Sequence, residues 1–136
     1  MIQWQDALNT GIEEIDEQHR NLIAINNKAY GLTQLDDGID HYDEIVKIIK
    51  ELTDYTEYHF GFEEKLLTKC KYAELEEQKM EHFFFMKKLS KMDLTKIDQD
   101  QEKAVQNILE MLVDWISSHI MTNDMKYVSC LRSNGM

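Results

Sequence analysis

The sequence predicts an all-α protein, an antiparallel up-down-up-down four-helix bundle. Its 136 residues include no proline and only five glycines, so little in the chain interrupts helices. Apolar residues recur at spacings of three and four along four separate stretches, and short polar segments join these stretches. Amphipathic helices with short links bury their apolar stripes against antiparallel neighbours. We expect one domain over residues 1–136, with an irregular N-terminal arm and a short C-terminal tail.

The first expected helix covers about residues 12–35. It follows an irregular arm, Met1 to Gly11, in which Trp4 is the expected anchor. The turn signal Asp36-Asp37-Gly38 ends it. Its inward stripe has the spacing of a bundle seam: Ile15, His19, Leu22, Asn26, Ala29 and Thr33.

The second expected helix covers about residues 41–67, with Asp40 as its cap. Its inward residues are Ile45, Ile48, Leu52, Tyr55, His59, Phe62, Glu63 and Leu66. The short polar stretch 68–71 suits a tight link between antiparallel helices. A third helix is expected over about 72–92, with its inward side formed by Leu75, Gln78, His82, Phe85, Met86 and Leu89. We expect the run 83–85 of three phenylalanines to fill two helix interfaces, with a partner-binding patch as the alternative.

A fourth helix is expected over about 99–122, after a connection at 93–98. Its inward residues are Val105, Ile108, Leu112, Trp115, Ile116 and His119. The tail at 123–136 has a weaker pattern, in which Tyr127, Val128 and Leu131 are candidates to pack back on the bundle. The order of these elements therefore completes a bundle of four antiparallel helices.

Composition excludes several classes of partner. The net charge of −11 argues against nucleic acid and against an anionic membrane surface, because phosphate contacts need clustered lysine and arginine. No apolar run approaches the roughly 20 residues of a membrane span, and the N-terminus is too polar for a signal peptide. Cys70 and Cys130 imply no disulfide framework, so a reducing cytoplasm is expected. Both belong to the end of the bundle that holds the candidate ligands; we expect free thiols, with a close approach of the two as the alternative. We also expect a monomer.

The chemistry of the chain is concentrated in four inward histidines. The sequence has five histidines, and His19, His59, His82 and His119 all fall on expected inward faces. A single inward histidine is usually an ordinary core residue, but these four have carboxylates beside them. Glu63 lies four residues after His59, on the same helix face. Asp124 lies five after His119, just past a turn where the helix is expected to loosen.

The bundle topology lets these residues meet. Helices one and three begin at the end of the bundle where helices two and four finish. At about 1.5 Å per residue, all four histidines lie within roughly 15 Å of that end. His41, at the start of the second helix, belongs to the far end and is expected to be exposed or capping.

The donor types predict the kind of metal. Imidazoles with carboxylates and no thiolate suit iron, manganese or zinc. Glu63 and Asp124 can each bridge two ions about 3.5–4 Å apart, with two histidines for each ion. An apolar surrounding favours iron and dioxygen chemistry, and the candidates for it are Leu22, Ile23, Phe60, Phe62, Ile116 and Ile120.

Four segments resemble the signatures of the hemerythrins, most closely the single-domain bacterial hemerythrins: TGIEEIDEQH, YHFGFEE, EHFFF and WISSHIMTND. The resemblance spans Gly11 to Tyr127. It implies a four-helix bundle with two iron ions, oxo- or hydroxo-bridged, that reversibly binds dioxygen for storage, delivery or sensing. The resemblance also implies a role for each candidate ligand, with two residues in each role. His19 and His59 would hold the iron with the open position, His82 and His119 would hold the second iron, and Glu63 and Asp124 would bridge.

One position departs from the family pattern. The family has H-x-x-x-H on the third helix, and here Gln78 stands first. Glu81 points about 100° around the helix from His82 and does not obviously replace the missing histidine. Gln78 either binds the second iron weakly through its amide oxygen or leaves a position for water. This keeps open an alternative function, a di-iron redox enzyme that reduces peroxide, dioxygen or nitric oxide.

Overall fold

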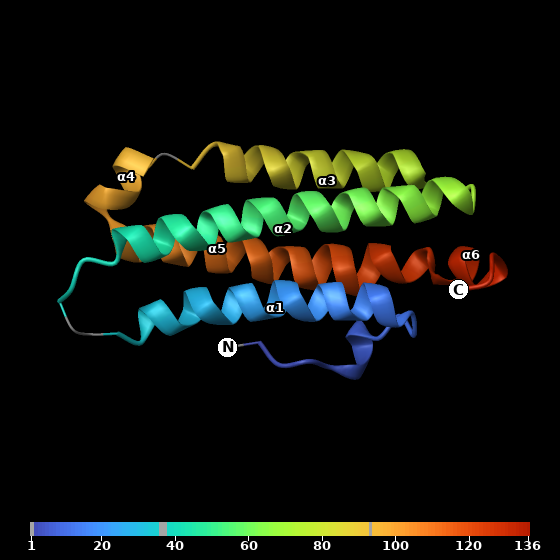
Figure 1. The fold of residues 1–136 in the computed structure, drawn as a ribbon, viewed down its shortest axis with the longest axis horizontal. Helices are drawn as coiled ribbons and strands as arrows, with labels where there is room; N and C mark the ends of the chain where they lie inside the picture. Colours follow the sequence, from blue (N-terminus) through green and yellow to red (C-terminus); the bar gives the residue numbers. More distant parts are fainter. Residues whose placement is uncertain (1, 36–37, 93) are drawn as a thin grey trace.

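Four long helical segments run alternately up and down and form the bundle (Figure 1). The computed structural model describes residues 2–35, 38–92 and 94–136. The long segments are α1 (Glu13–Thr33), α2 (Tyr42–Lys69), α3 (Leu75–Ser90), and α5 (Gln101–Asp114), which continues as the π-helix η2 (Trp115–Asp124). Three short helices complete the fold: η1 (Asp6–Leu8), α4 (Leu94–Gln99) and α6 (Val128–Ser133). The predicted all-α bundle is confirmed.

The core follows the predicted stripes, with small shifts at the helix ends. A large central cluster fills most of the bundle, and a smaller one closes the end where α6 lies. Thr33, expected inward, is exposed, because it is the last residue of α1 and lies at the very end of the helix. Leu66 is half-buried, whereas Leu67 is fully buried in the smaller cluster. None of the helices in the described residues combines the length and apolar character that crossing a lipid bilayer requires.

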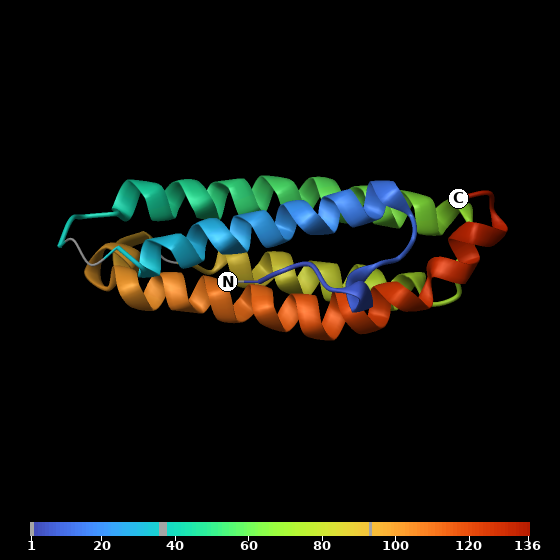
Figure 2. The same cartoon turned by 90° about the horizontal axis from the view of Figure 1, so that it is seen from below.

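The N-terminal arm runs back along the bundle beside α1 and α5 (Figure 2). Asn27 of α1 holds its beginning, since its side chain accepts from Ile2 N–H and donates to Ile2 O, both at 3.0 Å. Trp4 is only half-buried, and Leu8, 2 % exposed, is the more deeply packed anchor. The arm therefore covers the seam between the first and last long helices.

A buried carboxylate fixes the start of α1. Asp16 accepts hydrogen bonds from the Thr10 backbone (2.9 Å), the Thr10 hydroxyl (2.7 Å) and the Gly11 backbone (3.2 Å). Gly11 has a φ of +81°, which favours glycine at the bend between arm and helix. This bend lies about two turns before His19 and sets the direction of α1.

At the far end the links are short. Gly38 has a φ of +65°, as the expected turn requires, whereas Asp36 and Asp37 lie outside the described residues. The Asp40 carboxylate accepts from Tyr42 N–H at 2.9 Å, so it supports the start of α2 as expected. His41 is the N-cap residue of α2, with its Nδ1 3.0 Å from Glu44 Oε1, and stands well apart from the other histidines.

The expected connection at 93–98 contains a short helix, α4. Asp93 lies outside the described residues. Ile97 is 4 % exposed and packs into the central cluster, so this segment has an apolar face to bury. The Asp100 side chain then accepts from Lys103 N–H at 3.1 Å and caps α5.

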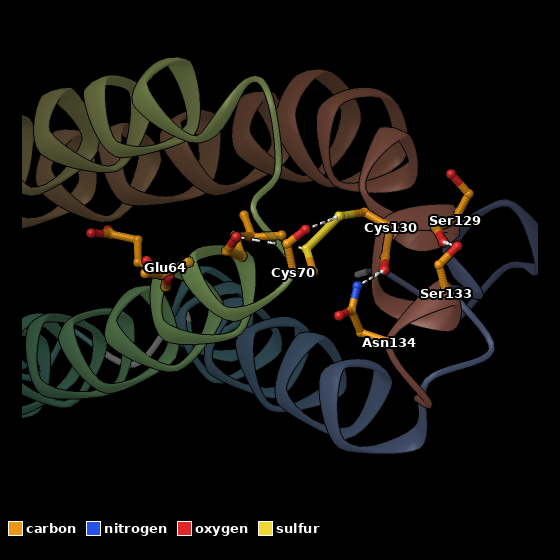
Figure 3. The surroundings of a disulfide bond; sticks show 8 residues. Glu64, Cys70, Ser129, Cys130, Ser133 and Asn134 are labelled. Atoms are coloured by element: carbon orange, nitrogen blue, oxygen red, sulfur yellow. Dashed lines mark hydrogen bonds between the residues drawn. A yellow bond between two sulfur atoms is a disulfide. The ribbon is translucent and has the colours of Figure 1, made fainter.

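The expectation of free thiols is wrong: Cys70 and Cys130 form a disulfide (Figure 3). Cys70 follows the last residue of α2, and Cys130 lies on α6. Their Cα atoms are 6.0 Å apart, within the usual range for a disulfide. The tail reaches this position because Tyr127 and Leu131 pack back on the bundle, as predicted. The number of cysteines in the sequence does not predict this disulfide, because the two residues meet only when the C-terminal tail packs against the bundle.

The expectation that three consecutive phenylalanines fill two interfaces is also wrong. Phe85 is 3 % exposed, whereas Phe83 is 61 % and Phe84 is 53 % exposed. Three consecutive helical residues span about 200° around the axis. The neighbours of α3 cover only part of that arc, so only Phe85 reaches the core.

Candidate metal centre

The structure brings the six candidate ligands together inside one end of the bundle. His19 lies on α1, His59 and Glu63 on α2, His82 on α3, and the remaining two on η2. All six, including His119 and Asp124, are at most 2 % exposed. One ligand atom from each of His19, His59, Glu63 and Asp124 lies within 4.8 Å of the others. The His82 and His119 rings lie beside them, 5.1 Å apart between centroids.

Asp124 connects the two pairs of histidines. Its Oδ2 lies 3.3 Å from Nε2 of His19, and its Oδ1 lies 3.0 Å from Nε2 of His119. Each oxygen therefore faces an imidazole from a different helix. Glu63 contacts Nε2 of His59 through Oε1 and lies close enough to His82 for its charge to act there. A carboxylate with one oxygen toward each of two histidines has the geometry of a bridging ligand.

The π-helix explains the five-residue spacing of His119 and Asp124. In an α-helix, residues five apart point about 140° away from one another. In η2 the wider i→i+5 repeat brings them to the same inward side. The sequence predicts a loosened helix here, and the structure shows the specific form that it takes. Such π-segments are frequent at functional sites.

Three side chains outside the centre contact three of the histidines at Nδ1, the ring nitrogen that faces away from the centre; we call these the outer side chains. Nδ1 of His59 lies 2.6 Å from Gln18 Oε1, and Nδ1 of His82 lies 2.9 Å from Glu64 Oε2. Nδ1 of His119 contacts Glu81 Oε2 in the same way. Since each partner is an oxygen that only accepts, each Nδ1 must carry the proton. In the neutral imidazole this leaves the Nε2 lone pair directed to the centre, as metal-binding histidines require.

Aromatic rings fix two of the imidazole planes. Phe60 stacks on His82 with centroids 4.0 Å apart and planes 4° from parallel. Trp115 stacks on His119 at 3.8 Å and 16°. Of the residues predicted to form an apolar surrounding, Phe62 is only half-buried and packs in the smaller cluster, whereas the others are buried in the central cluster. The buried members are Leu22, Ile23, Phe60, Ile116 and Ile120.

The buried polar atoms at this centre have hardly any partners except one another. Within the described part of the chain, Nε2 of the four histidines and the oxygens of the two carboxylates make no hydrogen bond to any other group, and Asp124 and Glu63 contact the imidazoles described above. Burying a polar atom without a partner costs free energy, and native proteins seldom leave many such atoms together. Inward imidazole nitrogens and carboxylate oxygens that converge in this way fit a pair of transition-metal cations.

The electrostatics keep the carboxylates ionised. Burial would raise the pKa of Asp124, but the charge of His119 and contacts with His119 and His19 hold it well below its ordinary value. Burial and the charge of Asp124 would raise the pKa of Glu63, yet His59 lowers it overall. Burial would lower the pKa of His119, but Asp124, with Glu63 and Glu81, raises it to about 9. The centre thus attracts positive charge, which a metal cation would supply.

Gln78 is buried beside this centre. It is 3 % exposed, and its Nε2 donates to the backbone oxygen of Asn123 at 3.3 Å. Its Oε1 is buried and has no hydrogen-bond partner among the residues described. Glu81 does not replace the histidine that the family has here, because it binds His119 and Asn123 instead. The amide oxygen of Gln78 is therefore available as a weak ligand.

Sequence reasoning missed the outer side chains Gln18, Glu64 and Glu81. Each is a direct sequence neighbour of a predicted ligand, and each reaches the histidine of the next helix in the bundle. A polar residue next to a ligand in the sequence is the signal that indicates this role. The sequence predicts Tyr127 as a residue that packs back on the bundle. It is fully buried, and burial and the charges of Asp124 and Glu63 raise its pKa well above the ordinary value.

The comparisons with known proteins agree with this geometry. Residues 10–131 match the family described as Hemerythrin HHE cation binding domain. A bacteriohemerythrin of Clostridium acetobutylicum is 41 % identical over 128 residues, which cover 94 % of this chain and 99 % of that protein. A bacteriohemerythrin of Pseudomonas aeruginosa is 34 % identical over 129 residues, 95 % of this chain and 80 % of that protein. A hemerythrin-like protein of Naegleria gruberi is 27 % identical over 128 residues, 94 % and 92 % of the two chains.

Proposed function

The chain belongs to the hemerythrin family, and on this premise we propose that it holds two iron ions and reversibly binds dioxygen. His19 and His59 would hold one ion, His82 and His119 the other, and Glu63 and Asp124 would bridge them. The observation that carries this proposal is the set of buried donor atoms that converge at the centre and, among the described residues, have at most one another as partners. Storage, delivery and sensing are all compatible with it.

The residues of this chain would orient the imidazole ligands and exclude water from the centre. When bound, ferrous iron supplies the electrons on which reversible dioxygen binding depends. The outer contacts of Gln18, Glu64 and Glu81 hold three imidazoles in one orientation. The buried residues Ile23 and Ile116 help to keep water from the centre. A dry site protects a reduced metal from side reactions.

An optical experiment tests this proposal. The iron-loaded protein is reduced without air, exposed to air, and then freed of oxygen under vacuum, and its visible spectrum is recorded at each stage. We expect a visible absorption band that appears with oxygen and disappears when oxygen is removed. Rapid, irreversible conversion to a ferric spectrum would contradict reversible binding and would favour redox turnover.

Gln78 favours a second candidate function, the reduction of peroxide, dioxygen or nitric oxide. A neutral amide oxygen or a water is a weaker ligand than imidazole, so one position on the second iron would be exchangeable. A small substrate such as peroxide could bind there. A centre of this kind would turn over its ligand instead of releasing it unchanged.

The substitution Gln78→His should restore the family pattern. We expect the second iron to be released to a chelator about 10–100-fold more slowly, the scale on which supporting contacts alter metal affinity. The lifetime of the oxygen-dependent absorption band should also increase. Gln78→Asn, which keeps the amide but shortens its reach, is the matched control and should not slow release. Unchanged iron stoichiometry and band lifetime in Gln78→His would show that Gln78 is a bystander.

A further inference from the structure

A small pocket with an acidic rim opens at Gln78. Its volume is about 160 Å³, and it lies between the beginning of α3 and the end of η2. Its walls are formed by Tyr72, Glu74, Glu77, Gln78, Glu81, Asn123 and Lys126. We call this pocket the acidic pocket. It lies at the end of the bundle that holds the candidate metal centre.

Three wall residues connect the acidic pocket with the centre. Glu81 contacts Nδ1 of His119, and the Asn123 side chain donates to Glu81 at 2.6 Å. Gln78 lies four residues before His82, on the same face of α3. The wall of the pocket thus includes a side chain that contacts a histidine of the centre.

Gln78 is the unusual member of the wall. It is 97 % buried, its amide nitrogen is bound to Asn123, and its amide oxygen has no partner in the described part of the structure. An oxygen of this kind can accept a cation, and it cannot repel one, because an amide carries no charge at any ordinary pH. A histidine in its place would carry a larger ring and could be protonated.

The charge of the rim selects for cations. Glu74, Glu77 and Glu81 give three negative charges and Lys126 one positive charge, a formal sum of −2. Partial burial, and then a hydrogen bond to Glu74 and the charges of Glu74, Asp124 and Glu77, raise the pKa of Tyr72 to about 12. A negative potential at the mouth of a pocket concentrates cations and speeds their arrival.

We propose that the acidic pocket is the port through which divalent cations, ferrous iron in particular, reach the second metal position. Gln78 forms its floor and offers the first inner oxygen. The inference rests on the proposed function, since it concerns access to the second iron. It also predicts that small anions reach this side of the centre poorly, because the rim repels them.

Isotope exchange in the holoprotein tests the port. The reduced, iron-loaded protein is mixed without air with isotopically labelled ferrous iron, and the label that it takes up is followed by mass spectrometry. The port variant is Glu74→Gln with Glu77→Gln. Glu74 is the N-cap residue of α3 but makes no side-chain capping hydrogen bond, so the helix should tolerate the change. The control, Glu57→Gln with Glu102→Gln, removes the same charge from exposed positions elsewhere.

We expect the port variant to slow exchange at one of the two iron positions about tenfold at low salt, and high salt to abolish the difference. The control should exchange like the unaltered protein. Lys126→Gln, which removes the positive charge, should act in the opposite direction and speed exchange. Equal rates in the port variant and the control would overturn the port alone. A protein that holds no iron would overturn the proposed function and the port together.

Discussion

Removal of the metal should lower the melting temperature of the protein by about 10–20 °C. Without cations, the inward nitrogens of four histidines and the oxygens of Glu63 and Asp124 stay buried with at most one another as partners in the described structure. Two buried carboxylates also repel one another. Together these effects cost about 3–5 kcal/mol, and about 3–5 °C is lost per kcal/mol in a domain of this size.

Thermal unfolding followed by circular dichroism measures this effect. The iron-loaded protein is compared with the same protein after reduction and dialysis against a chelator. A variant that binds no metal provides the control, since the chelator should leave its melting temperature unchanged. Equal melting temperatures of the loaded and metal-free proteins would sink the claim that the metal supports the fold.

The helices could be predicted because buried residues recur along each of them at spacings of three and four. One stripe of each helix faces the bundle axis, and Ile45, Leu52, Ile108 and Leu112 are buried as the three-and-four spacing predicts. Periodicity alone cannot locate where a helix ceases to have a neighbour. Thr33 and Phe83 fit possible interfaces by spacing, yet both are exposed, because no helix of the described residues covers those parts of α1 and α3.

The candidate ligands were predictable for a related reason. A histidine on an apolar stripe is conspicuous, and the antiparallel topology allows its depth in the bundle to be counted in residues. The outer contacts could not be found in this way, because Gln18 and Glu64 reach across to another helix. Such contacts depend on helix rotation and separation, which spacing in the sequence does not fix. The disulfide between Cys70 and Cys130 depends likewise on how the tail folds back.

The outer contacts have an order that emerges only in three dimensions. Gln18 of α1 holds His59 of α2, Glu64 of α2 holds His82 of α3, and Glu81 of α3 contacts the histidine of η2. Each helix thus orients the imidazole of the next. His19 does not share this support, since its Nδ1 has no hydrogen-bond partner among residues 2–35, 38–92 and 94–136.

The substitution Glu63→Ala should abolish binding of both metal ions. Glu63 is 1 % exposed, and within the described residues its carboxylate oxygens contact the imidazole of His59 and make no hydrogen bond to any other group, so it can serve two ions at once. Loss of a bridging ligand removes a donor and a negative charge from each ion. Glu63→Gln, which keeps the size of the side chain but removes its charge, should give nearly the same loss.

Glu64, the next residue in the chain, provides the matched comparison. It touches Nδ1 of His82 and not the centre itself, so Glu64→Ala should weaken one ion only, by about 10–100-fold in affinity. Iron content after gel filtration, together with far-ultraviolet circular dichroism to confirm helicity, distinguishes the three variants. If Glu63→Ala retains two irons for each folded chain, Glu63 does not bridge. If Glu63→Ala and Glu64→Ala lose the same amount of iron, Glu63 does not contribute more to iron binding than Glu64 does. The proposed difference between a ligand and a residue that only orients a ligand would then be wrong.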